Sequence, residues 1–149
     1  SIVSGHFTDT KENQIAVTVQ DGLNATLHIL ETKNGTTEVA ANLGMRSIMS
    51  MSKIPGGKGQ TDAIILESVS QMNSEKKRGS SDSTMPKITP REYFSAKYRN
   101  KRMVFERIVT AEVYASTVNQ MSDGAANLLI ASRNPDYDTV INRYVVTNN

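Results

Sequence analysis

The sequence has no cysteine and no tryptophan, and its only histidines, His6 and His28, lie far apart. Without cysteine, a disulfide framework, thiolate chemistry and a cysteine-ligated metal site are all excluded. Neither histidine has acidic residues at the spacing of a zinc or iron site, so we expect no metal and no cofactor. No nucleophile elbow and no Ser-His-Asp constellation emerges from the spacing of the serines, so we expect no enzymatic activity.

Long apolar runs are also missing. No run approaches the roughly 20 residues that cross a bilayer, and the N-terminal SIVSGHFTDT has neither the basic flank nor the apolar stretch of a signal peptide. We therefore expect a soluble intracellular protein with a single domain over residues 1–149. The apolar content of 38% and the mean hydropathy of −0.40 are low for this length, so we expect association to complete part of the core.

Charge is distributed unevenly along the chain. The net charge is only +2, but Lys76–Arg107 holds ten bases and three acids, whereas the rest of the chain holds seven bases and twelve acids. Clustered Lys and Arg indicate a surface that binds a polyanion. The alternative is a basic surface that is merely solvated.

The first half of the chain is typical of antiparallel strands. Gln14–Gln20 and Ala25–Leu30 alternate with period two around the turn Asp21-Gly22, which predicts a hairpin. The start of the chain predicts a short edge strand. PGGKG at 55–59 lacks the spacing of a phosphate-binding loop and is predicted to be a hairpin loop. Three further strands are predicted over 37–43, 46–53 and 62–71.

The last third predicts one strand and two helices. Arg102–Ala115 is rich in β-branched and aromatic residues, which indicates a central strand followed by a polar loop at 116–120. Ser122-Asp123 and Asn134-Pro135 are typical helix starts, and the apolar residues after each recur at helical spacing up to Arg133 and Tyr144. The expected fold is therefore α+β: an N-terminal hairpin, an antiparallel sheet of about five strands and two C-terminal α-helices. The polar, Ser-rich segment 73–89 is expected to be a long mobile loop.

A sheet with helices on one face and small polar or basic side chains on the other is a platform for nucleic acid. Aromatic and basic residues interleave between Arg91 and Arg102. A base stacked on Tyr93, Tyr98 or Tyr114 would contribute roughly 1 to 3 kcal/mol. The alternative is that these tyrosines pack at an interface.

The hairpin RSIMSMSKIPGGKGQTDAIILESVSQM and the C-terminal stretch from Glu106 to Asn149 resemble the coat proteins of single-stranded RNA bacteriophages of the levivirus type. The resemblance implies an intertwined homodimer, in which two sheets join edge to edge and the helices cross over the partner. It also implies an icosahedral shell that encloses genomic RNA, bound on the inner sheet face. The location would be the virion, assembled in the cytoplasm of the bacterial host.

At matching strand positions the resemblance implies RNA contacts from Arg46, Ser50, Ser52, Glu67, Arg102 and Glu106, with Val104 beside them. The basic and aromatic run adds Tyr93, Lys97 and Arg99. The loop before the last strand would make inter-subunit contacts through Lys76, Lys77, Arg78 and Pro86. The alternative function is a single-stranded nucleic-acid-binding protein of the OB type, whose strands form a partly open barrel. The two predicted helices count against that alternative.

Overall fold

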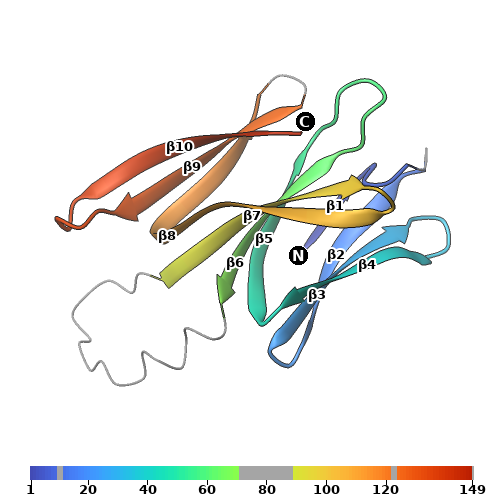
Figure 1. The fold of residues 1–149 in the computed structure, drawn as a ribbon, viewed down its shortest axis with the longest axis horizontal. Helices are drawn as coiled ribbons and strands as arrows, with labels where there is room; N and C mark the ends of the chain where they lie inside the picture. Colours follow the sequence, from blue (N-terminus) through green and yellow to red (C-terminus); the bar gives the residue numbers. More distant parts are fainter. Residues whose placement is uncertain (10–11, 71–88, 122–123, 149) are drawn as a thin grey trace.

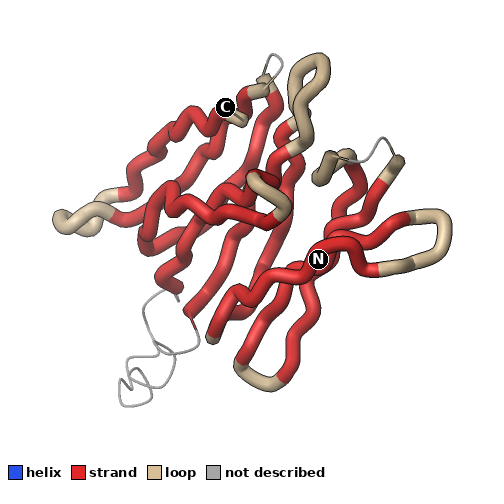
Figure 2. The backbone as a smooth tube through the Cα atoms, turned by 45° about the vertical axis from the view of Figure 1, so that its right-hand side comes forward, coloured by secondary structure: helices blue, strands red, loops and turns tan. Residues whose placement is uncertain are grey.

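A computed structural model describes residues 1–9, 12–70, 89–121 and 124–148, and all regular secondary structure within them is β-strand (Figures 1 and 2). The strands are β1 (Ile2–Gly5), β2 (Gln14–Asp21), β3 (Asn24–Glu31), β4 (Thr37–Gly44), β5 (Arg46–Ile54), β6 (Ala63–Ser70), β7 (Thr89–Arg99), β8 (Arg102–Gln120), β9 (Ala125–Arg133) and β10 (Thr139–Thr147). They form a four-stranded sheet of order β1-β2-β3-β4 and a six-stranded sheet of order β10-β9-β8-β7-β6-β5, both antiparallel. The predicted α+β class is wrong, because the described residues contain no helix.

The two predicted C-terminal helices are the hairpin β9–β10. In β9, burial alternates strictly, with Ala126, Leu128 and Ile130 inside the molecule. Residues four apart lie on one face of a helix and also on one face of a strand, so the spacing of Val140 and Tyr144 fits both structures. The period of two along β9 is the signal that decides between them.

The expected second helix start is a turn instead. The side-chain oxygen of Asn134 accepts hydrogen bonds from the backbone N–H groups of Asp136 (3.0 Å) and Asp138 (2.9 Å). Asn therefore caps local backbone donors, as it does at a helix start, but here the capped segment closes a β-hairpin loop. The other predicted helix start, Ser122-Asp123, lies outside the described residues.

The N-terminal half follows the prediction closely. β2 and β3 form the expected hairpin with Val17 opposite His28, and β1 is the expected edge strand beside β2. The four-stranded sheet packs on one face of the six-stranded sheet. Phe7, Leu27 and Ile29 meet Ile64 and Leu66 of β6 in this core.

The six-stranded sheet is curved into a half-barrel because β8 bends. β8 pairs with β7 as far as Val113 and with β9 beyond it, and the register shifts between Val113 and Ala115. Figure 1 shows that the strand changes direction between these two parts. A bulge of this kind turns a strand around a corner of a sheet. The predicted polar loop at 116–120 is wrong, since these residues belong to β8.

The bend brings the far ends of the sheet together. The Gln120 side-chain amide donates to the backbone oxygen of Lys53 (3.1 Å), and that of Asn148 donates to those of Ile54 (3.3 Å) and Thr61 (2.8 Å). On the same side, a second core forms from residues of all six strands: Ile54, Ala63, Ile65, Tyr93, Val113, Ala126, Leu128, Ile130 and Val146. That face is therefore the concave one, and the four-stranded sheet lies on the opposite face.

β7 is an element that the sequence did not predict. Of the predicted mobile loop at 73–89, only Thr89 is described, and it begins β7. The strand pairs with β6 on one side and with β8 on the other, so it lies inside the sheet. The sheet has six strands rather than about five, and three of them, β7, β9 and β10, were not predicted as strands.

Candidate nucleic-acid interface

Eight of the nine residues predicted to bind RNA share the concave face of the six-stranded sheet. Alternate residues of β7 place Tyr93, Lys97 and Arg99 on one face. Residues directly opposite on paired strands also share a face, and Glu67 lies opposite Tyr93 while Arg102 lies opposite Arg99. By the same pairing, Ser50, Ser52 and Glu106 join this face.

Arg46 is the exception, and a β-bulge is the reason. β5 pairs Ile48 with Ser68 and Ser50 with Glu67, which leaves Met49 as an extra residue. The extra residue shifts the alternation by one, so Arg46 faces the four-stranded sheet while Ser50 faces the concave side. The Arg46 guanidinium lies 4.8 Å from the centre of the Phe94 ring on that covered face. Without the bulge, period-two alternation would place Arg46, Ser50 and Ser52 on one face, as the sequence predicted.

The middle of the concave face holds a buried carboxylate. Glu67 Oε2 accepts hydrogen bonds from the Tyr93 hydroxyl (2.6 Å) and the Ser116 hydroxyl (2.5 Å), and Arg91 Nη1 lies 3.3 Å from Glu67 Oε1. Burial raises the pKa of Glu67, but the hydrogen bonds from Ser116 and Tyr93 and the charge of Arg91 lower it by more, so the pKa lies below its usual range.

The same contacts act on Tyr93 in the opposite direction. Burial and the hydrogen bond to Glu67 raise the pKa of the Tyr93 hydroxyl to about 12. The tyrosine is only 1% exposed, so a base has no access to its ring. Glu67 and Tyr93 thus stabilise the sheet by bonding to each other. The base stacking predicted for Tyr93 would need an exposed ring, and this ring is buried.

A cavity of about 320 Å³ opens beside this network. Hydroxyl groups of Ser50, Ser52 and Thr117 line it together with Glu67, and its apolar wall includes Ile65, Val118 and Leu128. Hydroxyls of this kind donate and accept hydrogen bonds to polar ligands. The cavity can therefore hold a polar group against an apolar wall.

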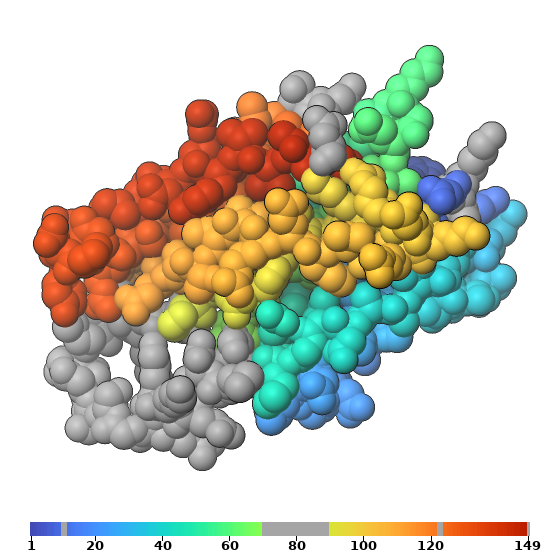
Figure 3. Space-filling model, viewed as in Figure 1, coloured from blue at the N-terminus to red at the C-terminus, as the bar shows by residue number. Residues whose placement is uncertain are grey.

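Positive charge concentrates at the tip of the β7–β8 hairpin. Asn100 and Lys101 both have positive φ, 51° and 65°, which is the geometry of a two-residue hairpin turn. This turn places Arg99 directly opposite Arg102. We call Lys97, Arg99, Lys101 and Arg102 the basic hairpin. Figure 3 shows the yellow-to-gold β7–β8 hairpin on the surface, with its tip at the right of the view.

Little in the described part of the chain neutralises this tip. Arg99, Lys101 and Arg102 are exposed, and none of them forms an ion pair with a described acid. Arg99 donates to two backbone oxygens, from Nη1 to Tyr98 O (3.4 Å) and from Nη2 to Asn148 O (3.5 Å). Burial lowers the pKa of Lys97, and Arg99 adds to this effect while Glu106 opposes it.

Sequence reasoning missed Arg91, Ser116 and Lys101. The alternation Arg91, Tyr93, Ser95, Lys97, Arg99 was the available signal for β7 and for Arg91, whereas Ser116 reaches Glu67 only because β8 bends. The predicted inter-subunit residues Lys76, Lys77, Arg78 and Pro86 lie outside the described residues.

The described residues contain no group of three or more His, Asp or Glu that could hold a metal ion. No helix in this part of the chain is long and apolar enough to cross a membrane. No protein-family model matches the chain, and no curated protein or solved structure is significantly similar to it.

Proposed function

We propose that this protein binds single-stranded nucleic acid, RNA above all, through the basic hairpin. The observation that carries the proposal is the cross-strand pair Arg99 and Arg102. Like charges directly opposite each other destabilise a strand pair, and no described acid forms an ion pair with either arginine. A phosphate backbone supplies the missing negative charge, since Lys and Arg bind phosphates with release of counterions.

Two further features support this function. The described residues contain no helix. The two predicted helices therefore no longer count against a β-protein that binds single strands on a curved sheet. The hydroxyl-lined cavity on the concave face lies on the same side of β7 as Lys97 and Arg99. Tyr93 and Arg99 are six residues apart on β7, or about 20 Å at the usual rise per residue, so one bound strand can reach both places.

A titration tests the proposal. We expect the affinity for a fluorescent oligo(U) to fall steeply with salt, with a slope of about −0.7 in log K against log salt for each phosphate contact. The double variant Arg99→Gln, Arg102→Gln should weaken binding and flatten the slope by about 1.4. The double variant Arg133→Gln, Arg143→Gln removes the same charge from β9–β10 and serves as the matched control.

Three results would contradict the proposal. The first is oligo(U) binding that does not change with salt. The second is a hairpin double variant that binds as tightly as the wild type. The third is an equal loss in both double variants, because that would be an effect of net charge rather than of the hairpin.

A second candidate function is a coat-protein subunit that dimerises and assembles into an icosahedral shell around RNA, but without the helices that the levivirus resemblance implied, since that stretch is β9 and β10. The observation that favours it is the edge strand β10, which pairs only with β9 among the described residues. Ile141 and Val145 on its outer face are 74% and 53% exposed. Open edges and exposed apolar side chains promote self-association.

Electron microscopy and size-exclusion chromatography of the purified protein test this second function. Particles that copurify with RNA, and that Ile141→Lys disperses without loss of oligo(U) binding, would support a coat protein. A monodisperse monomer free of RNA would contradict it and leave the binding proposal to the salt titration.

A further inference from the structure

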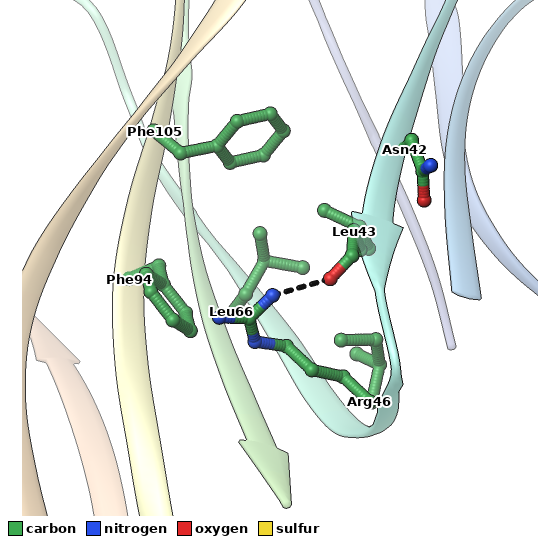
Figure 4. A pocket seen from close by; sticks show the side chains of 7 residues that line it. Asn42, Leu43, Arg46, Leu66, Phe94 and Phe105 are labelled. Atoms are coloured by element: carbon green, nitrogen blue, oxygen red, sulfur yellow. Dashed lines mark hydrogen bonds between the residues drawn. The ribbon is translucent and has the colours of Figure 1, made fainter. Parts of the chain in front are cut away.

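A small apolar cavity lies between the two sheets, on the face opposite the concave one. Its volume is about 150 Å³, and its lining residues are Asn42, Leu43, Arg46, Ile48, Leu66, Phe94 and Phe105. Figure 4 shows the rings of Phe94 and Phe105 on one side and Leu43 on the other, with the Arg46 side chain reaching in beside Leu66. Asn42 is exposed, so the cavity lies next to solvent.

The Arg46 guanidinium is only partly satisfied by the protein. Nη1 donates to Leu43 O at 2.5 Å, and Nη2 lies 3.6 Å from Glu92 Oε2. The Nε atom is buried and has no hydrogen-bond partner. Glu92 also pairs with Arg107 at 3.5 Å, so two arginines share one carboxylate. A positive charge and an unused donor therefore stand beside an apolar cavity.

We propose that this cavity binds a small aromatic carboxylate, with the ring among Leu66, Phe94 and Phe105 and the carboxylate on Arg46. A cavity of about 150 Å³ has room for a benzene ring. An arginine gives a carboxylate short, charge-assisted hydrogen bonds, which are about twice as strong as neutral ones. This site is independent of the nucleic-acid proposal, because it lies on the other face of the six-stranded sheet.

Benzoate, benzyl alcohol and acetate separate the two parts of the site. We expect benzoate to shift the methyl resonances of Ile48 and Leu66 saturably in a ¹³C-methyl NMR titration. Benzyl alcohol keeps the ring without the charge, and acetate keeps the charge without the ring. Each should bind about tenfold more weakly than benzoate or worse, because each loses either the charged hydrogen bonds or the apolar burial.

Variants then assign the binding to Arg46. Arg46→Met should weaken benzoate about tenfold and leave benzyl alcohol unchanged. Arg133→Met is the matched control, because Arg133 also lies over an aromatic ring, that of Tyr137 at 4.9 Å, and pairs with Glu112 at 2.9 Å, but does not line the cavity. Ile48→Phe should fill the cavity and abolish the binding of both aromatic ligands while the circular dichroism spectrum keeps its β-sheet form.

The proposal is overturned if benzoate causes no saturable methyl shifts, or if it binds no better than benzyl alcohol. Equal effects of Arg46→Met and Arg133→Met would also overturn it. Should Arg46→Met fail to fold, the comparison of the three ligands on the wild type and the Ile48→Phe variant still decides the question.

Discussion

The two faces of the six-stranded sheet are built on different physical principles, although they share the same strands. On β6, Ile64 and Leu66 enter the core between the sheets, whereas Ile65 and Glu67 face the concave side. The first face buries apolar side chains against Phe7 and Leu27. The second face also holds the buried carboxylate of Glu67, which accepts two hydroxyl hydrogen bonds and pairs with Arg91.

This difference separates the sources of stability. Apolar burial is non-directional, so the covered face should tolerate substitutions that keep the side-chain volume. Substitutions there that remove volume should lower the free energy of unfolding. The network around Glu67 depends on direction, because removal of one partner leaves a buried charge without compensation. Both faces bury an apolar core, but the concave face also carries the Glu67 network, whose contribution depends on charge and pH.

The largest expected effect is on the covered face. Leu27→Ala removes a side chain that is 0% exposed, and we expect the free energy of unfolding to fall by about 2 to 5 kcal/mol, since a cavity remains. Urea denaturation followed by circular dichroism measures the loss. Val19→Ala on the neighbouring strand β2 is the control, because Val19 is exposed and should lose about 0.5 kcal/mol or less. Equal losses would mean that the core between the sheets is not closely packed.

The next largest effect should come from the concave face. We expect Glu67→Gln to lower the free energy of unfolding by about 2 to 3 kcal/mol, because it removes charged hydrogen bonds and leaves Arg91 without its partner. Glu112→Gln breaks the more exposed ion pair with Arg133 and should cost about 1 kcal/mol or less. If the two variants lose the same amount, the network contributes no more than a surface pair.

The difference in free energy of unfolding between the wild type and Glu67→Gln should depend on pH. Because the pKa of Glu67 in the folded protein lies below its ordinary value of 4.5, the stabilisation from its ionised form is present above that ordinary value. It is lost as the pH falls through the folded-state pKa. The gap between wild type and Glu67→Gln should therefore narrow below about pH 4.5.

The parts of the fold that local patterns determine were predictable. Alternation and Asp21-Gly22 located the β2–β3 hairpin, because turn chemistry and side-chain period agree there. The C-terminal hairpin was mistaken for helices because Asn134 caps either structure and because apolar residues four apart fit both periods. The period of two in the burial of β9 distinguishes the two, but it arises only when β9 pairs with β8, whose residues are distant in the sequence.

Some residues of the candidate site could be placed from the sequence and others could not. Alternation within predicted or predictable strands accounts for the face shared by Ser50, Ser52, Glu67, Lys97 and Arg99. Arg46 could not be placed, since the extra residue Met49 is visible only in the register with β6. Ser116 was equally hidden, because it approaches Glu67 through the bend in β8.

The smallest of these effects should come from Tyr93, one of the three partners of Glu67. Tyr93→Phe removes one hydrogen bond to a charged group and should cost about 1.5 kcal/mol at neutral pH.

The raised pKa of the Tyr93 hydroxyl, about 12, also makes the stability of the protein depend on pH in the alkaline range. The unfolded chain releases the tyrosine proton near pH 10 and the folded chain retains it, so stability falls as pH rises from about 10 through 12. Urea titrations at pH 9, 10 and 11 should show a shallower fall in Tyr93→Phe than in the wild type. Tyr137→Phe, at a ring that is 69% exposed, should leave the fall unchanged. A fall that is equally steep in Tyr93→Phe would show that the hydroxyl does not keep its proton against Glu67, and the network would then depend on Arg91 and Ser116 alone.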